Sequence, residues 1–101
     1  MEIRLIIAGS RDFFDYNLVA NQANLFIAAI RTETPNTLIS IVSGNAKGVD
    51  ELGEQFAKEN NLEVIRIPAE WDRHGRFAGP IRNKEMAKLG THVLAFLGWK
   101  K

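Results

Sequence analysis

The sequence contains no cysteine, almost no net charge and no long apolar run, and each absence narrows its possible functions. Without cysteine the chain has no disulfides and no thiolate metal ligands. A net charge of +1, from 13 basic and 12 acidic residues, argues against bulk electrostatic attraction to DNA or RNA. The first apolar run, residues 3–8, is too short for a signal peptide or a membrane span. We therefore expect a soluble, cytoplasmic protein with no membrane partner.

The composition is that of an ordinary globular protein. Its 101 residues, 46% hydrophobic and 25% charged, fit one domain over residues 1–101. Four short apolar runs alternate with three helix-like segments. The apolar runs cover residues 3–8, 38–42, 63–67 and 92–97, and the helix-like segments cover residues 16–31, 49–60 and 80–89. This β-α-β-α-β-α-β order predicts an α/β, Rossmann-like three-layer fold with a mostly parallel four-stranded sheet.

The handedness of the connections predicts how the helices cover this sheet. In the strand order 3-2-1-4, right-handed crossovers place the first two helices on one face and the third helix on the other. Open parallel sheets are normally covered on both faces, so the face with a single helix is under-covered. We therefore expect a homo-oligomer, with Phe96, Leu97 and Trp99 as candidate contacts.

The loops that follow the strands carry most of the glycines and five basic residues. Ligands of open α/β sheets bind outside the carboxyl ends of the strands, and these loops would meet at that edge. The five cations are Arg11, Lys47, Arg73, Arg76 and Arg82. A nearly neutral protein therefore gathers positive charge where a ligand is expected to bind.

The loop after the second strand leads directly into a helix. It reads Ser43-Gly44-Asn45-Ala46-Lys47-Gly48-Val49-Asp50. Its glycines would let backbone N–H groups approach an anion, the helix N-terminus adds partial positive charge, and Lys47 adds a mobile cation. The loop matches neither G-x-x-x-x-G-K-[ST] nor G-x-G-x-x-G. Phosphate binding and a plain glycine turn with a solvated lysine both stay open at this point.

Arg82 and Asn83 are candidate ligand contacts near the start of the third helix. Arg82 is expected in the first helical turn, where the helix dipole disfavours a cation, so a bound anion would explain it. A surface ion pair with Asp72 or Glu85 is the alternative. Asn83 can donate and accept hydrogen bonds, which suits a polar ligand edge, or it can cap locally.

Arg11, with Ser10 beside it, directly follows the predicted central strand. This position favours a ligand contact, and an ion pair with Asp12 or Asp50 is the alternative. Trp71 could stack on a base or pack as part of the core or a lid.

The remaining titratable residues give acid–base candidates but no metal site. Asp50 and Asp72 could bind ribose hydroxyls or act as acid–base groups, and Asp50 could equally cap its helix. His74 and His92 lack the spacing of metal ligands, so we treat them as structural or solvent-exposed. We expect no metal and no cofactor.

Four ordered motifs, spread over almost the whole chain, resemble one family. They are Ala8-Gly9-Ser10-Arg11, Ser43-Gly44-x-Ala46-x-Gly48-Val49-Asp50, Ala69-x-Trp71 and Ala78-Gly79-Pro80-x-Arg82-Asn83-x-x-Met86. Together they resemble the YspA-like branch of the SLOG superfamily, which joins nucleotide-sensing domains with phosphoribohydrolases. The resemblance implies a Rossmann-like fold and a nucleotide, ADP-ribose derivative or nucleotide second messenger as ligand. By motif match it places in the pocket Gly9, Ser10, Arg11, Gly44, Gly48, Asp50, Arg82 and Asn83.

The sequence departs from this family pattern after the fourth strand. Relatives usually continue into a Ser/Gly-Thr loop and another helix, and the phosphoribohydrolases carry Pro-Gly-Gly-x-Gly-Thr and a glutamate there. Residues 95–101 contain neither feature. We therefore expect this chain to bind its ligand without cleaving it, and the departure adds to the expectation of an oligomer.

These observations lead to three functional hypotheses. The first is a sensor or sequestering protein for a phosphate-bearing, nucleotide-derived small molecule, with phage counter-defence as one version. Its expected ligand-binding residues are Gly9, Ser10, Arg11, Ser43, Gly44, Asn45, Lys47, Gly48, Asp50, Trp71, Arg82 and Asn83. The second is an N-glycosidic or phosphoribosyl hydrolase that uses Asp50 or Asp72. The third is a nucleic-acid or protein interaction module, which the neutral net charge disfavours.

Overall fold

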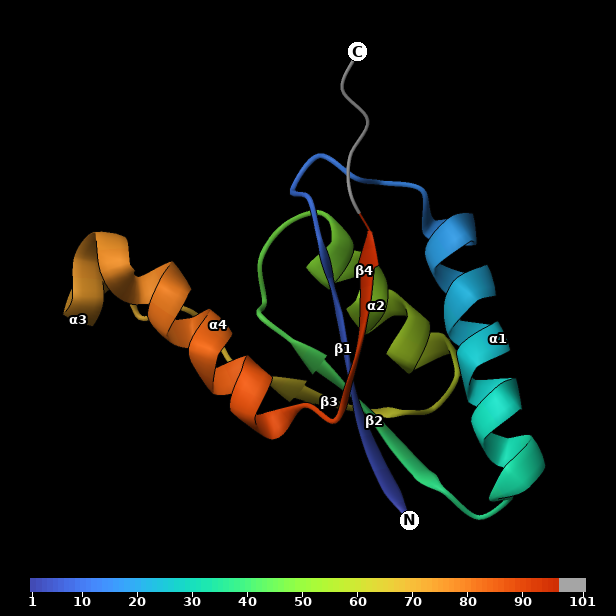
Figure 1. The fold of residues 1–101 in the computed structure, drawn as a ribbon. Helices are drawn as coiled ribbons and strands as arrows, with labels where there is room; N and C mark the ends of the chain where they lie inside the picture. The colour runs from blue at the N-terminus through green and yellow to red at the C-terminus, as the bar shows by residue number, and fades with distance from the viewer. Residues whose placement is uncertain (97–101) are drawn as a thin grey trace.

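The four apolar runs form one parallel sheet in the order β3-β2-β1-β4. The computed structural model describes residues 1–96. The elements are β1 (Glu2–Gly9), α1 (Tyr16–Glu33), β2 (Leu38–Ser43), α2 (Val49–Glu59), β3 (Glu63–Arg66), α3 (Trp71–His74), the 3-10 turn η1 (Gly75–Phe77), α4 (Ala78–Leu89) and β4 (His92–Phe96). Figure 1 shows the strands connected through these helices. The predicted α/β, Rossmann-like class is confirmed, and the strand order is the one assumed above for placing the helices.

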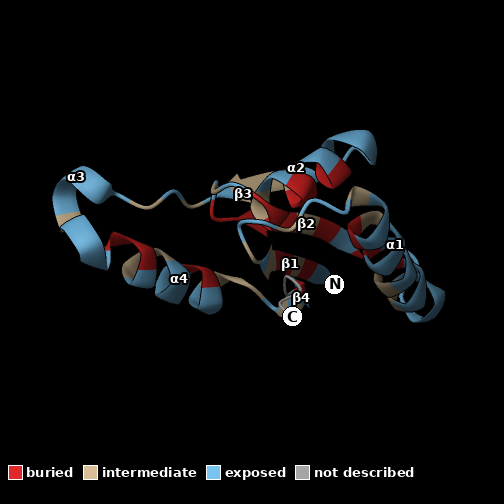
Figure 2. Cartoon of the chain, turned by 90° about the horizontal axis from the view of Figure 1, so that it is seen from above, coloured by how far each residue is buried: buried red, intermediate tan, exposed pale blue. Residues whose placement is uncertain are grey.

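Alternate side chains of the central strand β1 enter two separate hydrophobic cores. Ile3, Leu5 and Ile7 pack in the core formed with α1 and α2, whereas Ile6 packs with Met86 of α4. Figure 2 shows the sheet lying between these two sets of helices. The prediction that the first two long helices share one face, and that the third covers the other, is confirmed.

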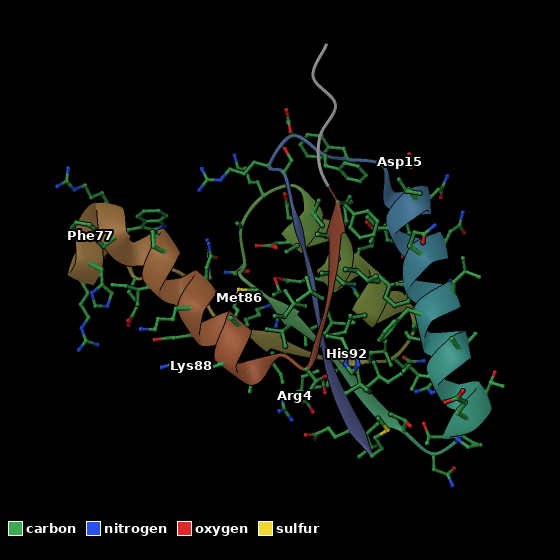
Figure 3. All side chains as sticks on the ribbon, viewed as in Figure 1. Arg4, Asp15, Phe77, Met86, Lys88 and His92 are labelled. Atoms are coloured by element: carbon green, nitrogen blue, oxygen red, sulfur yellow. The ribbon has the colours of Figure 1, made fainter. Side chains whose placement is uncertain are left out.

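The ends of the three long helices follow local capping signals. The carboxylate of Asp15 caps α1 by accepting a hydrogen bond from the Leu18 amide at 3.1 Å (Figure 3). The Glu51 carboxylate accepts one from the Gly48 amide at 3.2 Å at the start of α2. Gly90 follows the last residue of α4, as predicted. Within residues 1–96, no helix is long and apolar enough to cross a membrane.

The loop expected between the third strand and the third helix is partly helical, which corrects the sequence interpretation. The carbonyl of Glu70 accepts hydrogen bonds from the amides of Arg73 and His74, at 3.1 and 2.9 Å, and these bonds close the turn α3. The chain then continues through η1, and α4 begins at Ala78. Arg82 is therefore the fifth residue of its helix and lies beyond the first turn. The helix-dipole argument for an anion at Arg82 is wrong, because that effect fades within the first turn.

The two edges of the sheet differ in charge. The edge strand β3 carries exposed Glu63 and Arg66, whereas no charged residue lies in the edge strand β4. Phe96 is only 8% exposed and its ring lies 5.6 Å from that of Phe13, so it belongs to this chain's own core and does not form an association surface. Leu97 and Trp99 lie outside the described residues. Self-association stays a prediction, which the molecular mass in solution would check.

Candidate functional site

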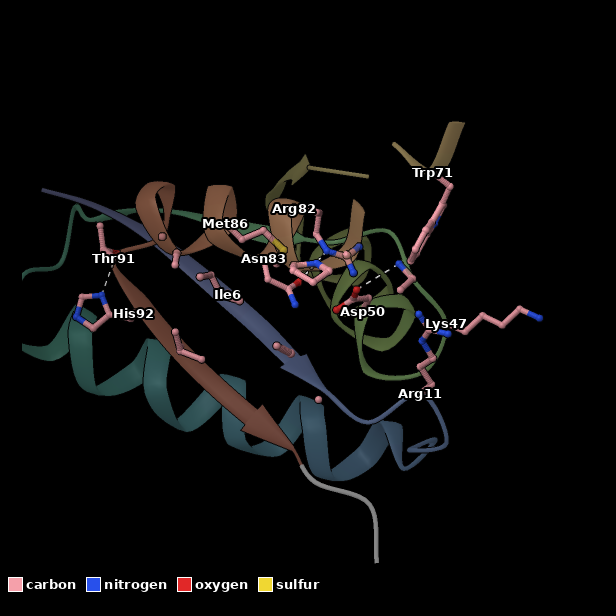
Figure 4. A pocket seen from close by; sticks show the side chains of 18 residues that line it. Ile6, Arg11, Lys47, Asp50, Trp71, Arg82, Asn83, Met86, Thr91 and His92 are labelled. Carbon is pink, nitrogen blue, oxygen red and sulfur yellow. Dashed lines mark hydrogen bonds between the residues drawn. The ribbon is translucent and has the colours of Figure 1, made fainter. Parts of the chain in front are cut away.

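A cavity of about 600 Å³ lies along α4, between that helix and strands β1 and β4 (Figure 4). It extends from the loops at the carboxyl edge of the sheet to the start of β4. The cavity is lined by Ile6, Ala8, Gly9, Arg11, Ala46, Lys47, Asp50, Trp71, Gly79, Pro80, Arg82, Asn83, Met86, Ala87, Gly90, Thr91, His92 and Val93. Its location agrees with the rule that ligands of open α/β sheets bind at the carboxyl ends of the strands.

Two glycines let backbone segments pack closely beside this cavity, Gly9 between β1 and β4 and Gly48 between the loops after β1 and β2. A Cβ atom on Gly9 would overlap the carbonyl oxygen of Phe96 in the neighbouring strand β4. Gly48 has a φ of +81°, and a Cβ there would lie 2.5 Å from the carbonyl oxygen of Ser10. That same carbonyl accepts a hydrogen bond from the Val49 amide at 3.4 Å. The two loops are thus joined before any ligand binds.

Three cations from three separate segments line the cavity: Arg11, Lys47 and Arg82. Arg82 is fixed, because its Nη1 donates to the carbonyl of Gly44 at 2.6 Å and its Nε donates to Oδ1 of Asn83 at 2.8 Å. Lys47 is exposed, and Figure 4 shows its side chain extended outward at the mouth. The cavity therefore has one positioned cation and two on exposed loops.

The alternative for Arg82, a surface ion pair with Asp72 or Glu85, is not found among the described residues. The guanidinium instead lies against Gly44 and close enough to Asp50 to influence its titration. Arg82 is thus directed toward the loop after β2, across the mouth of the cavity.

Among residues 1–96, Asp50 is the only carboxylate that lines this cavity. It is half-buried, and its Oδ2 accepts a hydrogen bond from the Ala46 amide at 3.2 Å. Burial raises the pKa of Asp50 above its ordinary value, and the Ala46 amide and the Arg82 guanidinium offset part of that rise. Asp50 bonds back to the preceding loop, so the cap of α2 is supplied by Glu51 instead. A carboxyl group in this position can accept a hydrogen bond from a ligand hydroxyl when it is ionised, or it can carry a proton.

The backbone amides of the loop after β2 are largely occupied, which corrects the expectation that they face an anion. The Asn45 amide donates to Ser43 Oγ at 3.0 Å, and the Gly48 amide donates to Glu51. The Ala46 amide donates to the carboxylate of Asp50, the second residue of α2. Acidic side chains at the helix start thus take the place that a phosphate would have taken. The Lys47 side chain of this loop remains at the cavity mouth.

The predicted site residues divide into those at the cavity and those that support it. Gly9, Arg11, Lys47, Asp50, Trp71, Arg82 and Asn83 line the cavity. Asn45 lies in an adjoining recess of about 320 Å³ that shares several of these residues. The residues outside both linings are Ser10, Ser43, Gly44 and Gly48.

The serines and Asp72 have other surroundings. The Ser43 hydroxyl is buried and donates to Glu54 Oε2 at 2.6 Å, and the Ser10 hydroxyl donates to Asp12. Asp72 lies in a separate recess beside Arg73. The cavity therefore gives no support to a role for Asp72 in hydrolysis.

Trp71 lies at the mouth of the cavity, at the beginning of α3. Trp71 is 51% exposed, and a Cβ atom added to Gly79 would lie 3.6 Å from its ring. Figure 4 shows Trp71 at the end of the cavity beyond Asp50, far from His92. Its ring is thus placed beside the cations.

Sequence reasoning missed the apolar half of the cavity. Ile6 and Ala8 of β1, Val93 of β4, and Met86 and Ala87 of α4 line it. The signal was present, because the alternation along β1 sends these two residues to the face that has one long helix. Within residues 1–96, no group of three or more His, Cys, Asp or Glu side chains could hold a metal ion.

The fold and the cavity define a class, and comparison with known proteins gives the family. This is a Rossmann-like α/β protein with a cation-lined cavity at the carboxyl edge of its sheet. The chain belongs to the YspA, cpYpsA-related SLOG family (YAcAr), whose family model matches residues 3–74.

A curated relative extends this comparison beyond residue 74. The chain is similar to the "Gene 61 protein" of Mycobacterium phage D29, with 32% identity over 99 residues that cover 92% of this chain and 75% of the relative. No solved structure matches the chain significantly.

Proposed function

We propose that this protein binds a phosphate-bearing, nucleotide-derived small molecule in the cavity along α4. The observation that carries the proposal is the meeting of Arg11, Lys47 and Arg82 around one cavity, where Asp50 is the single carboxylate among the described lining residues. Cations that converge from three chain segments match the charge of a phosphate group. A volume of about 600 Å³ falls within the range of small-molecule sites.

The residues of the mouth suit the parts of a nucleotide. Arg82, already fixed by Gly44, holds a phosphate oxygen without losing side-chain freedom on binding. Arg11 and Lys47 close on the same group from their exposed loops. The Asp50 carboxylate accepts hydrogen bonds from ribose hydroxyls.

A sensing or sequestering role fits the family and the phage relative. A protein that only holds its ligand needs affinity and no chemistry, and the fixed Arg82 supplies affinity. Sequestration of a nucleotide signal during phage infection is the version that similarity to a phage protein supports. Docking on nucleic acid is less favoured, because these cations line a cavity rather than an open stripe.

A ligand panel tests the proposal. We expect one or more nucleoside phosphates, cyclic nucleotides or ADP-ribose isomers to raise the melting temperature and to be recovered intact by chromatography. At 100 times the Kd, such a ligand stabilises the fold by about 3 kcal/mol. If no member of the panel shifts the melting temperature at millimolar concentration, the binding proposal fails.

Hydrolysis of an N-glycosidic bond is the second candidate, and the burial of Asp50 beside the cavity favours it. In that reaction water adds to the ribose carbon, the carbon–nitrogen bond breaks, and the base leaves with a proton. Asp50 would activate the water or stabilise positive charge on the ribose. Free base and ribose phosphate recovered from the same panel would establish this candidate instead of simple binding.

The raised pKa of Asp50 predicts a pH-dependent gain in stability for Asp50→Asn. Between the ordinary value of 3.8 and the raised folded-state pKa, the unfolded chain loses its proton first, so the folded state loses stability as pH rises. Above both pKa values the folded state carries the full cost of burying the ionised carboxylate, and below both values it carries none of that cost. We expect urea unfolding to show Asp50→Asn gaining on the parent between pH 3 and pH 7. A difference that does not change over this range would contradict burial as the dominant effect.

A further inference from the structure

The cavity has two chemically different halves. Its cations and Asp50 lie at the carboxyl edge, whereas its other half is a trough floored by Ile6, Ala8 and Val93 and walled by Met86 and Ala87. Figure 4 shows Ile6 and Met86 farther along the cavity from its mouth than Arg11 and Lys47. The phosphate chemistry described above leaves this trough without an assigned role.

The chain covers this trough only in part: Ile6 and Met86 are each 6% exposed and pack together, whereas the side chains beside them are more open. Val93 is 59% exposed although it lies in a strand, and Ala95 beside it is also exposed. Ala8 pairs in register with Ala95, and Ile6 pairs with Val93. Two pairs, spaced two residues apart along the strands, give a floor about 7 Å long. The small side chains of Ala8 and Ala95 leave space above the end of this floor that is nearest the cations.

The wall contributes groups that suit a flat ring. Met86 is 6% exposed and its thioether faces the sheet side of α4 (Figure 3), where sulfur contacts with aromatic rings are favourable. Asn83 lies between Arg82 and Ile6 in Figure 4. Because Asn83 Oδ1 accepts from Arg82 Nε, its NH2 group is left to donate toward the cavity. A ring with an acceptor at its edge would meet that donor.

We propose that the trough binds the heterocyclic base of the ligand, while its phosphates lie at the cationic mouth. This inference rests on the proposed function and assigns the base to the trough rather than to Trp71. Trp71 lies at the mouth beside the cations, so a base stacked there would compete with the phosphates for the same end and leave Val93 and Ala87 exposed. A base in the trough buries that surface and leaves the cations free.

The test compares ligands with and without a base. ADP, GDP, CDP and UDP are titrated against inorganic pyrophosphate, which carries the phosphates alone. Ala8→Leu fills the floor, and Ala87→Leu fills the wall from an exposed helix position where leucine is a good helix former. Ala28→Leu, an exposed position on α1, is the matched control.

We expect both trough variants to weaken the best nucleoside diphosphate by about tenfold or more, with a larger loss for purines than for pyrimidines. Pyrophosphate should bind both variants and the control with unchanged affinity. Unchanged nucleotide affinity in both trough variants, with a loss in Trp71→Ala, overturns the trough assignment and leaves the phosphate site standing. Absence of binding by pyrophosphate and by every nucleotide overturns the proposed function and this inference together.

Discussion

Arg82→Ala is expected to weaken nucleotide binding by about 10- to 100-fold. Hydrogen bonds to a charged group contribute about 1.5–3 kcal/mol, and each 1.4 kcal/mol corresponds to a factor of about ten in Kd. Among the three cations, substitution of Arg82 is expected to cause the largest loss of affinity, because Gly44 and Asn83 already hold its guanidinium in place. Isothermal titration with the best ligand of the panel measures the effect.

Two further variants separate a specific contact from loss of charge. Lys84→Ala removes the same charge from an exposed position of α4 that does not line the cavity, so we expect less than a twofold change. Arg82→Lys keeps the charge but loses the planar fork and should fall between the parent and Arg82→Ala. Equal effects of Arg82→Ala and Lys84→Ala would mean that only the overall charge matters, and the proposed phosphate contact would be wrong.

Gly9→Ala is expected to cost about 3 kcal/mol of folding stability, which corresponds to a fall of more than about 10 °C in melting temperature. The new methyl group would overlap the carbonyl oxygen of Phe96 and approach Val49 Cγ2 to 2.8 Å. The carbonyl belongs to the backbone of β4 and cannot rotate away. Strand β4 must therefore move from β1, and the hydrogen bond from the Ser10 amide to that carbonyl, now 3.1 Å, would lengthen. Urea unfolding and thermal melting measure the loss.

Gly79→Ala provides the matched control for this substitution. Gly79 also lines the cavity, but it is the second residue of α4, and the nearest contact to an added Cβ is the Trp71 ring at 3.6 Å. Alanine is a better helix former than glycine, by at most about 1 kcal/mol at this position, so the variant should be as stable as the parent or slightly more stable. A Gly9→Ala protein as stable as Gly79→Ala would show that β1 and β4 are not so tightly apposed.

The sequence alone determined the elements that depend on neighbouring residues. The apolar runs at residues 3–8 and 38–42 gave the two central strands, and the long helices begin and end within two residues of the predicted positions. For the strand order 3-2-1-4, the helix faces followed from the handedness of parallel connections, which is a general property of L-amino-acid chains, whereas the order itself is established only by the tertiary structure. The gathering of Arg11, Lys47 and Arg82 at one edge followed in turn, because parallel strands end on the same side. Arg73 and Arg76, which were predicted to join them, do not line the cavity.

Only the tertiary structure decided which side chains meet at that edge. Arg82 and Gly44 are 38 residues apart, and no local pattern indicates that this guanidinium donates to that carbonyl instead of pairing on the surface. Likewise, Glu51 and Asp50 turn back onto the amides expected to face an anion, and a helical turn after Glu70 shifts the start of α4. The apolar trough depends on the placement of α4, which leaves Val93 uncovered. Local preferences act over a few residues, whereas contacts between distant residues follow from how strands and helices pack, so the sequence indicates the edge of the site but not its contacts.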